Sequence, residues 1–181
     1  NYIDLDKVGV MGHSMGAQAA SDTMLYFSRL YDTAIEEAQS PDSDGGTDVT
    51  EAELQHAEDV MIIDAALPTG MNTSVVSDWS QVRCNTGVLF TTYDENGYLT
   101  SNKTAFIAGD TPEALAMVQD IDPNITSVEE GVYYGNKDDG TLRVLYQPTT
   151  THPLVHFSPA CTADIIEFFD TCWDLNTELS Y

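Results

Sequence analysis

Three residues that could together perform acyl transfer occur along this chain in the order Ser14, Asp94 and His152. A serine hydroxyl is a weak nucleophile at neutral pH, and it becomes effective when an imidazole within hydrogen-bond reach takes its proton. The imidazole in turn needs a carboxylate that fixes its orientation. We therefore predict Ser14 as the nucleophile, His152 as the base and Asp94 as the orienting acid.

Ser14 lies in the segment Gly12-His13-Ser14-Met15-Gly16, which has the form G-x-S-x-G. The largely apolar run at residues 7–11 predicts a short buried strand before this segment. A helix over 16–38 is predicted after it, because apolar residues recur there in steps of three and four. A sharp turn between strand and helix presents a serine hydroxyl, and the helix N-terminus brings N–H groups to a developing oxyanion. We predict the Met15 N–H as one oxyanion donor; the alternative is a chance serine in a strand–helix turn.

Other residues compete for the acid and base roles. Asp94 could simply begin a tight turn in the segment Tyr93 to Gly97, and Glu95 beside it is the fallback acid. His156 competes with His152, and we expect it to pack or to line a pocket. His13, inside the turn, is likewise expected to pack beside the nucleophile or line the pocket.

Strand-like and helix-like segments alternate along the chain, which predicts an α/β fold with a mostly parallel sheet and flanking helices. We treat residues 1–181 as a single, partial domain. In such sheets functional residues collect at the carboxyl ends of the strands, which each of the three candidates follows. The strands are expected at 7–11, 59–64, 86–92 and 141–146, and the helices at 16–38, 51–56 (capped by Thr50), 111–118 and 159–173.

The charge of the chain excludes one class of partner. It carries 30 acidic and 6 basic residues, a formal net charge of -24. Such a surface repels nucleic acid and anionic membranes, so we expect no nucleic-acid partner. The acidic residues are spread along the chain, which favours a solvated surface over a docking site for a cationic partner. No apolar run approaches the ~20 residues of a membrane-spanning helix.

Metal and disulfide chemistry are not expected. Cys84, Cys161 and Cys172 form no C-x-x-C motif and are predicted to be free, buried thiols. A loosely calcium-like spacing has Thr47 at the position where such a loop needs glycine, and we expect a solvated acidic loop there instead. Its acidic residues are Asp42, Asp44, Asp48 and Glu53. We expect no metal and no cofactor.

Three motifs in order resemble the α/β-hydrolase superfamily, and more narrowly a set of mostly uncharacterised bacterial α/β-hydrolases. They are the G-H-S-M-G of Gly12 to Gly16, the Y-D-E of Tyr93 to Glu95 and the T-H-P-x-x-H-F-S of Thr151 to Ser158. The resemblance covers about Asp4 to Phe169. It implies the α/β-hydrolase fold and a carboxylesterase-like serine hydrolase without a cofactor, acting on a small ester or acyl substrate.

The same resemblance raises a question about completeness. The chain begins almost inside the first predicted strand, so we expect the N-terminal strands of the hydrolase fold, and the loop that carries a second oxyanion donor, to be missing. The missing segment or a second copy of the chain is expected to cover the edge of that strand. Some members lie in longer chains with membrane helices, which implies a membrane or cell-surface anchor outside this chain. The alternative function is a non-catalytic binding or assembly module.

Overall fold

A computed structural model describes residues 4–5, 7–40, 49–101 and 107–176. Its strands are β1 (Gly9–His13), β2 (Ala65–Thr69), β3 (Asn85–Leu89), β4 (Tyr133–Tyr134) and β5 (Arg143–Tyr146). Its α-helices are α1 (Met15–Ala38), α2 (Glu51–Val60), α3 (Glu95–Ser101), α4 (Pro112–Gln119) and α5 (Pro159–Trp173). Short 3₁₀ helices are η1 (Thr73–Val75), η2 (Trp79–Gln81), η3 (Ala108–Asp110), η4 (Lys137–Asp139) and η5 (His152–Phe157).

The strands form one sheet in the order β1-β2-β3-β5-β4. β1, β2, β3 and β5 pair in parallel, and only the two-residue β4 runs antiparallel, beside β5. The carboxyl ends of the four parallel strands therefore meet at one edge of the sheet. This arrangement confirms the expected α/β class with a mostly parallel sheet.

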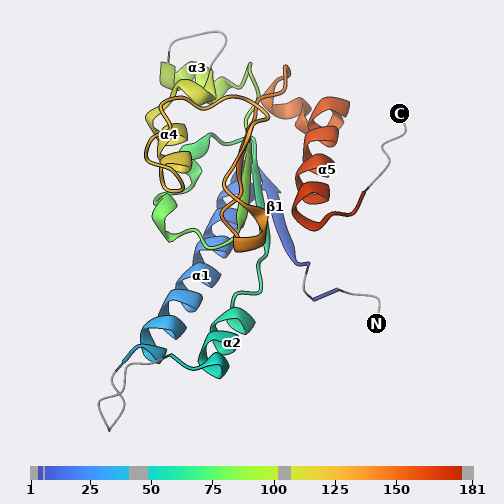
Figure 1. Ribbon diagram of the computed structural model, residues 1–181. Coiled ribbons are helices and arrows are strands. Elements are labelled where there is room, and N and C mark those ends of the chain that lie inside the picture. The colour runs from blue at the N-terminus through green and yellow to red at the C-terminus, as the bar shows by residue number, and fades with distance from the viewer. Residues whose placement is uncertain (1–3, 6, 41–48, 102–106, 177–181) are drawn as a thin grey trace.

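Helices cover both faces of the sheet, with α1 and α4 on one side and α5 on the other (Figure 1). Strand alternation sends neighbouring side chains to opposite faces, as Ala66 packs in the cluster with α1 while Leu67 packs in the cluster with α5. β2, β3 and β5 are buried along their whole length. β1, at the edge, is partly exposed. Both faces of the inner strands are thus excluded from water, as parallel sheets require.

The predicted helices agree well with the structure. α5 has the expected bounds, and the side chain of Ser158 caps it by accepting from the Cys161 N–H. Thr50 and Glu53 form a capping box at the start of α2. α4 begins after the capping residue Thr111 with proline in its first turn. Local signals suffice for these helices because capping depends on residues adjacent in the sequence.

The strand predictions were less accurate. The strand expected at 59–64 is wrong, because residues 59–60 end α2 and β2 begins only at Ala65. The aliphatic run 60–63 suggested a buried strand, but Ile62 is half exposed and the small residues of β2 occupy the interior. Pro68 lies within β2. Its missing N–H accompanies a gap in the β2–β3 register between Ala66 and Thr69.

Some other predicted elements have different bounds in the structure, and one predicted loop lies mostly outside the described residues. The first strand is Gly9–His13 rather than 7–11, and β4 was missed. The turn expected at 93–97 is shorter and earlier, at residues 92–93, and α3 begins at Glu95. Residues 41–48, most of the acidic loop, lie outside the described residues. Cys84, Cys161 and Cys172 are free and buried, as predicted. In the described ranges, no helix has both the length and the apolar character that a membrane crossing demands.

Candidate active site

Ser14 occupies a strained backbone position between β1 and α1. Its φ of 60° and ψ of -119° are rare for a residue with a side chain. Ser14 is the residue that precedes the first turn of α1, yet its side chain makes no capping hydrogen bond. The hydroxyl that would ordinarily cap the helix is therefore available to another partner.

Neighbouring backbone holds this turn in place. A Cβ on Gly12 would lie 2.1 Å from the carbonyl oxygen of Gly16, so only glycine allows the strand to approach the helix here. A Cβ on Gly16 would meet nothing within 4 Å, so that motif position is not required sterically. From β2, Thr69 accepts the Ser14 N–H at 2.9 Å and donates its hydroxyl to the Gly12 carbonyl at 3.0 Å. The end of β2 thus fixes the turn on both sides of the serine.

A buried imidazole–carboxylate pair lies at the same end of the sheet. His152 Nδ1 is 2.7 Å from Asp94 Oδ2, and the two side chains are 12% and 0% exposed. The other carboxylate oxygen accepts the Asn96 N–H at 2.9 Å, and the Thr91 hydroxyl lies 3.5 Å from Oδ2. These contacts fix the carboxylate, which accepts from Nδ1 and leaves His152 Nε2 as the ring nitrogen that can exchange a proton.

Contacts of His13 and Gly70 place this pair beside the serine turn. The His13 ring, one residue before Ser14, lies 4.5 Å from the His152 ring between centroids. Gly70, directly after β2, has a φ of 68°, and a Cβ there would lie 2.6 Å from His13 Nε2 and 3.0 Å from His152 Cε1. Both imidazoles therefore rest against a glycine backbone. Gly70 was not singled out from the sequence, where the only signal was a glycine directly after a proline-containing buried segment.

No hydrogen bond joins the serine and the imidazole in the described residues. Such bonds are often long without substrate and tighten in the reacting complex. The N–H of Met15 belongs to the first turn of α1, where no carbonyl within the helix accepts it, and the Met15 side chain is 89% exposed. This N–H is available to a negatively charged oxygen.

The structure also places the two residues that compete for the acid and base roles, Glu95 and His156. Glu95 is exposed at the start of α3, whereas Asp94 is 2% exposed and contacts His152. His156 does not contact Asp94; its ring lies 4.3 Å from that of His13, edge to face. Asp94 and His152 thus form the pair, and Glu95 and His156 do not.

The pKa of His13 is lowered from that of an ordinary histidine. Burial lowers the pKa of His13, and the charges that His152 and His156 can carry lower it further. Contact with the His152 backbone and the charge of Asp94 oppose this shift. The imidazole next to the serine is therefore neutral over a wider pH range than an ordinary histidine.

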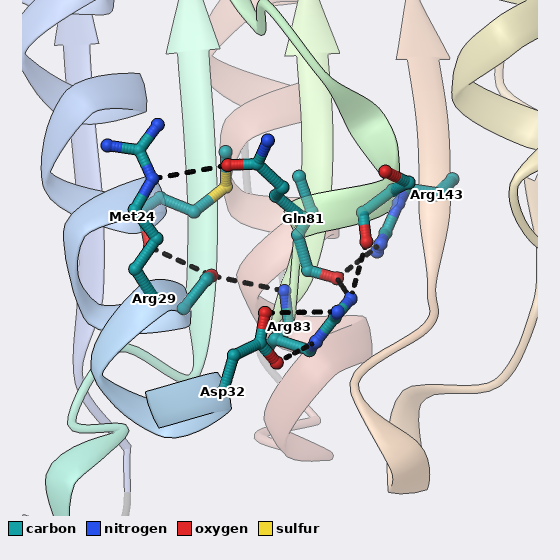
Figure 2. Close-up of polar contacts among 9 residues, drawn as sticks. Met24, Arg29, Asp32, Gln81, Arg83 and Arg143 are labelled. Carbon is teal, nitrogen blue, oxygen red and sulfur yellow. Dashed lines mark hydrogen bonds and ion pairs between the residues drawn. The ribbon is translucent and has the colours of Figure 1, made fainter. Parts of the chain in front are cut away.

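A second cluster of ionisable groups lies at the opposite, amino end of the strands. There a cavity of about 850 Å³ is lined in part by Arg83, Lys137 and Arg143, half of the six basic residues. Figure 2 shows Arg83 paired with Asp32, at 2.7 Å and 3.1 Å, and Arg143 bonded to the backbone. Arg143 is 1% exposed and donates to four carbonyls, those of Val82, Cys84, Gly140 and Leu142. This cluster joins the loops that enter β3 and β5.

No group of histidine, cysteine and carboxylate side chains in the described residues has the geometry to hold a metal ion. Comparison of the chain with family models, with curated proteins and with solved structures found no match. The interpretation of the site therefore depends on its own residues and their geometry.

Proposed function

We propose that this protein is a serine hydrolase of the α/β-hydrolase type that cleaves an ester or a related acyl bond. The observation that carries the proposal is the buried Asp94–His152 pair, 2.7 Å apart, next to a serine with strained backbone and an uncommitted hydroxyl. A buried carboxylate on an imidazole and a strained turn both have a free-energy cost, and both accumulate at reactive sites.

The reaction begins when the Ser14 hydroxyl attacks the substrate carbonyl and His152 Nε2 accepts its proton. Asp94 stabilises the imidazolium that forms, and the oxyanion of the tetrahedral intermediate accepts the Met15 N–H. Collapse breaks the bond to the alcohol, which leaves with the proton from His152. Water then attacks the acyl-serine with His152 as base, releasing the carboxylic acid and restoring Ser14.

The distribution of charge favours an uncharged substrate. Three of the described basic side chains line the cavity at the amino end of the strands, far from the serine. A hollow of about 350 Å³, lined by Met71, Asn72, Ser74, Asn96 and Leu99, adjoins the segments that carry Gly70 and Asp94. None of these five side chains is charged, so a small neutral acyl or alcohol group suits this hollow better than an anionic one.

A second candidate function is a non-catalytic binding or assembly module. The edge of β1 favours it, because no described strand pairs with that side and Met11 is 47% exposed there. An unpaired edge can bind an extended segment of another chain. We predict that the edge is covered in the working protein, either by a further segment or by a second copy.

Labelling with a fluorophosphonate separates the two functions, because it requires an activated serine nucleophile. The wild-type chain should gain one phosphonyl group on Ser14 by mass spectrometry and should hydrolyse short p-nitrophenyl esters. Ser14→Ala should lose both. Ser158→Ala, which alters the cap of α5, is the matched control and should keep the label. Absence of the label in a folded wild-type chain would contradict the hydrolase proposal.

A further inference from the structure

The imidazole of His13 lies between two other imidazoles at the candidate site. Its centroid is 4.5 Å from that of His152, with the planes tilted by 43°, and 4.3 Å from that of His156, nearly perpendicular at 69°. His13 belongs to β1, while the other two belong to η5. This contact joins the strand that presents the serine to the segment that presents the base.

The position of the His13 ring is closely restricted. A Cβ on Gly70 would overlap two of its atoms, at 2.6 Å and 2.7 Å, so the ring packs directly on the backbone of Gly70. The His156 ring also packs against the His13 ring, edge to face, at 4.3 Å between centroids. The ring is therefore held on several sides by backbone and side chains of different segments.

His13 has a polar contact with the His152 backbone, but one of its two nitrogen atoms has no partner. Its Nε2 is buried and has no hydrogen-bond partner among the described residues. A buried polar atom without a partner costs about 1–3 kcal/mol, so Nε2 does not explain why a ring is buried at this position. Burial and the neighbouring imidazoles lower the pKa of His13, which favours the neutral ring beside the base.

We propose that His13 is a positioning residue, whose ring packs against the His152 imidazole and holds it in its pairing with Asp94, above the serine turn. His156, which also contacts the His13 ring, supports it. The role in the reaction rests on the proposed hydrolase function, but the role in holding the His152–Asp94 pair does not. A hydrogen bond made only at Nδ1 leaves an imidazole free to pivot, and a small displacement of a catalytic group costs up to about 10²-fold in rate.

Two substitutions distinguish the contribution of the His13 ring packing from the contribution of its nitrogen atoms. His13→Ala removes the packing surface, whereas His13→Phe keeps an aromatic ring and removes both ring nitrogens, the unpartnered Nε2 among them. We expect kcat to fall about 10- to 100-fold in His13→Ala, with KM within about twofold, and to be largely restored in His13→Phe. His156→Ala should act in the same direction with a smaller effect. His56→Ala, on the exposed surface of α2, is the matched control and should leave kcat unchanged.

A spectroscopic measurement tests the inference without any assay of hydrolysis. The proton between His152 Nδ1 and Asp94 Oδ2 should give a far-downfield ¹H resonance in the full chain. This signal should persist in wild type, His13→Phe and His56→Ala, and should broaden or vanish in His13→Ala that is folded by circular dichroism. An unchanged signal in His13→Ala would overturn the inference, as would a His13→Phe chain as impaired as His13→Ala. If the signal behaves as expected but no serine is labelled, the positioning role stands and the hydrolase proposal fails.

Discussion

The two ends of the sheet both bury an ionisable group, but they use it differently. At the carboxyl end, the carboxylate of Asp94 meets one nitrogen of His152 and leaves the other for a proton. At the amino end, the guanidinium of Arg143 donates to four backbone carbonyls and lies 6.0 Å from the centre of the Trp79 ring. Burial of charge therefore does not by itself identify a reactive site. The capacity for chemistry depends on whether a group next to the buried charge remains uncommitted.

The strongest test of this contrast is Asp94→Asn. Asparagine keeps an oxygen for the Asn96 N–H but presents an amide to His152, which favours the wrong tautomer of the imidazole. We expect kcat for p-nitrophenyl acetate to fall about 10⁴-fold, while the melting temperature changes little. A variant that keeps more than a tenth of wild-type kcat would mean that the pair does not serve catalysis.

Arg143→Met should produce the opposite pattern. It removes a charged donor from four carbonyls, of which those of Cys84 and Leu142 still accept from Thr86, so we expect the free energy of unfolding to fall by about 3 kcal/mol. Urea denaturation measures this change, and the activity per folded molecule should remain at the wild-type level. The matched control is Arg29→Met, whose exposed side chain contacts Gln81 and should change stability by less than about 0.5 kcal/mol. Loss of activity with unchanged stability would assign the amino end a part in the reaction.

Gly70→Ala should affect the site at the carboxyl end of the strands by steric overlap, because it removes no reactive group. The new methyl group would overlap His13 and approach His152, and φ of 68° also disfavours alanine. We expect a loss of about 10²-fold in kcat together with a lower melting temperature. Gly131→Ala has a similar φ of 70° but no neighbour within 4 Å, so it should share the backbone strain without the loss of kcat.

Asp164 on α5 belongs to neither end and should show the smallest effect. Burial, together with the charges of Glu167 and Glu130, raises the pKa of Asp164 to about 6. Between about pH 4 and 6, the Asp164 carboxyl is still protonated in the folded state but already ionised in the unfolded state. The free energy of unfolding therefore falls as pH rises through this window. Asp164→Asn should therefore be more stable than wild type at pH 7 and equal to it at pH 4. Equal melting temperatures at pH 7 would contradict this expectation.

Prediction from the sequence succeeded where the cause is local. The helix boundaries at Thr50, Thr111 and Ser158 follow from capping side chains a few residues from their partners. The strand–turn–helix around Ser14 follows from glycine next to a short apolar run. β2 was misplaced because Val60 to Ile63 is more hydrophobic than the Ala-Ala-Leu-Pro-Thr segment that actually enters the sheet. Burial of that segment depends on the close approach of its neighbours, which hydrophobicity alone does not predict.

For the candidate site, too, some features follow from the sequence and others only from the tertiary structure. The types and order of Ser14, Asp94 and His152, and the class of the fold, are properties of the sequence by itself. The preference for His152 over His156 and for Asp94 over Glu95 also came from the sequence. Only the tertiary structure brings His152 and Asp94 into contact, packs the His13 ring against His152, and makes Gly70 the surface on which both rings rest. The reason is physical, because these contacts depend on distances of a few ångströms between segments that are far apart in the chain. Composition and spacing limit which residues can react, and packing determines which of them meet.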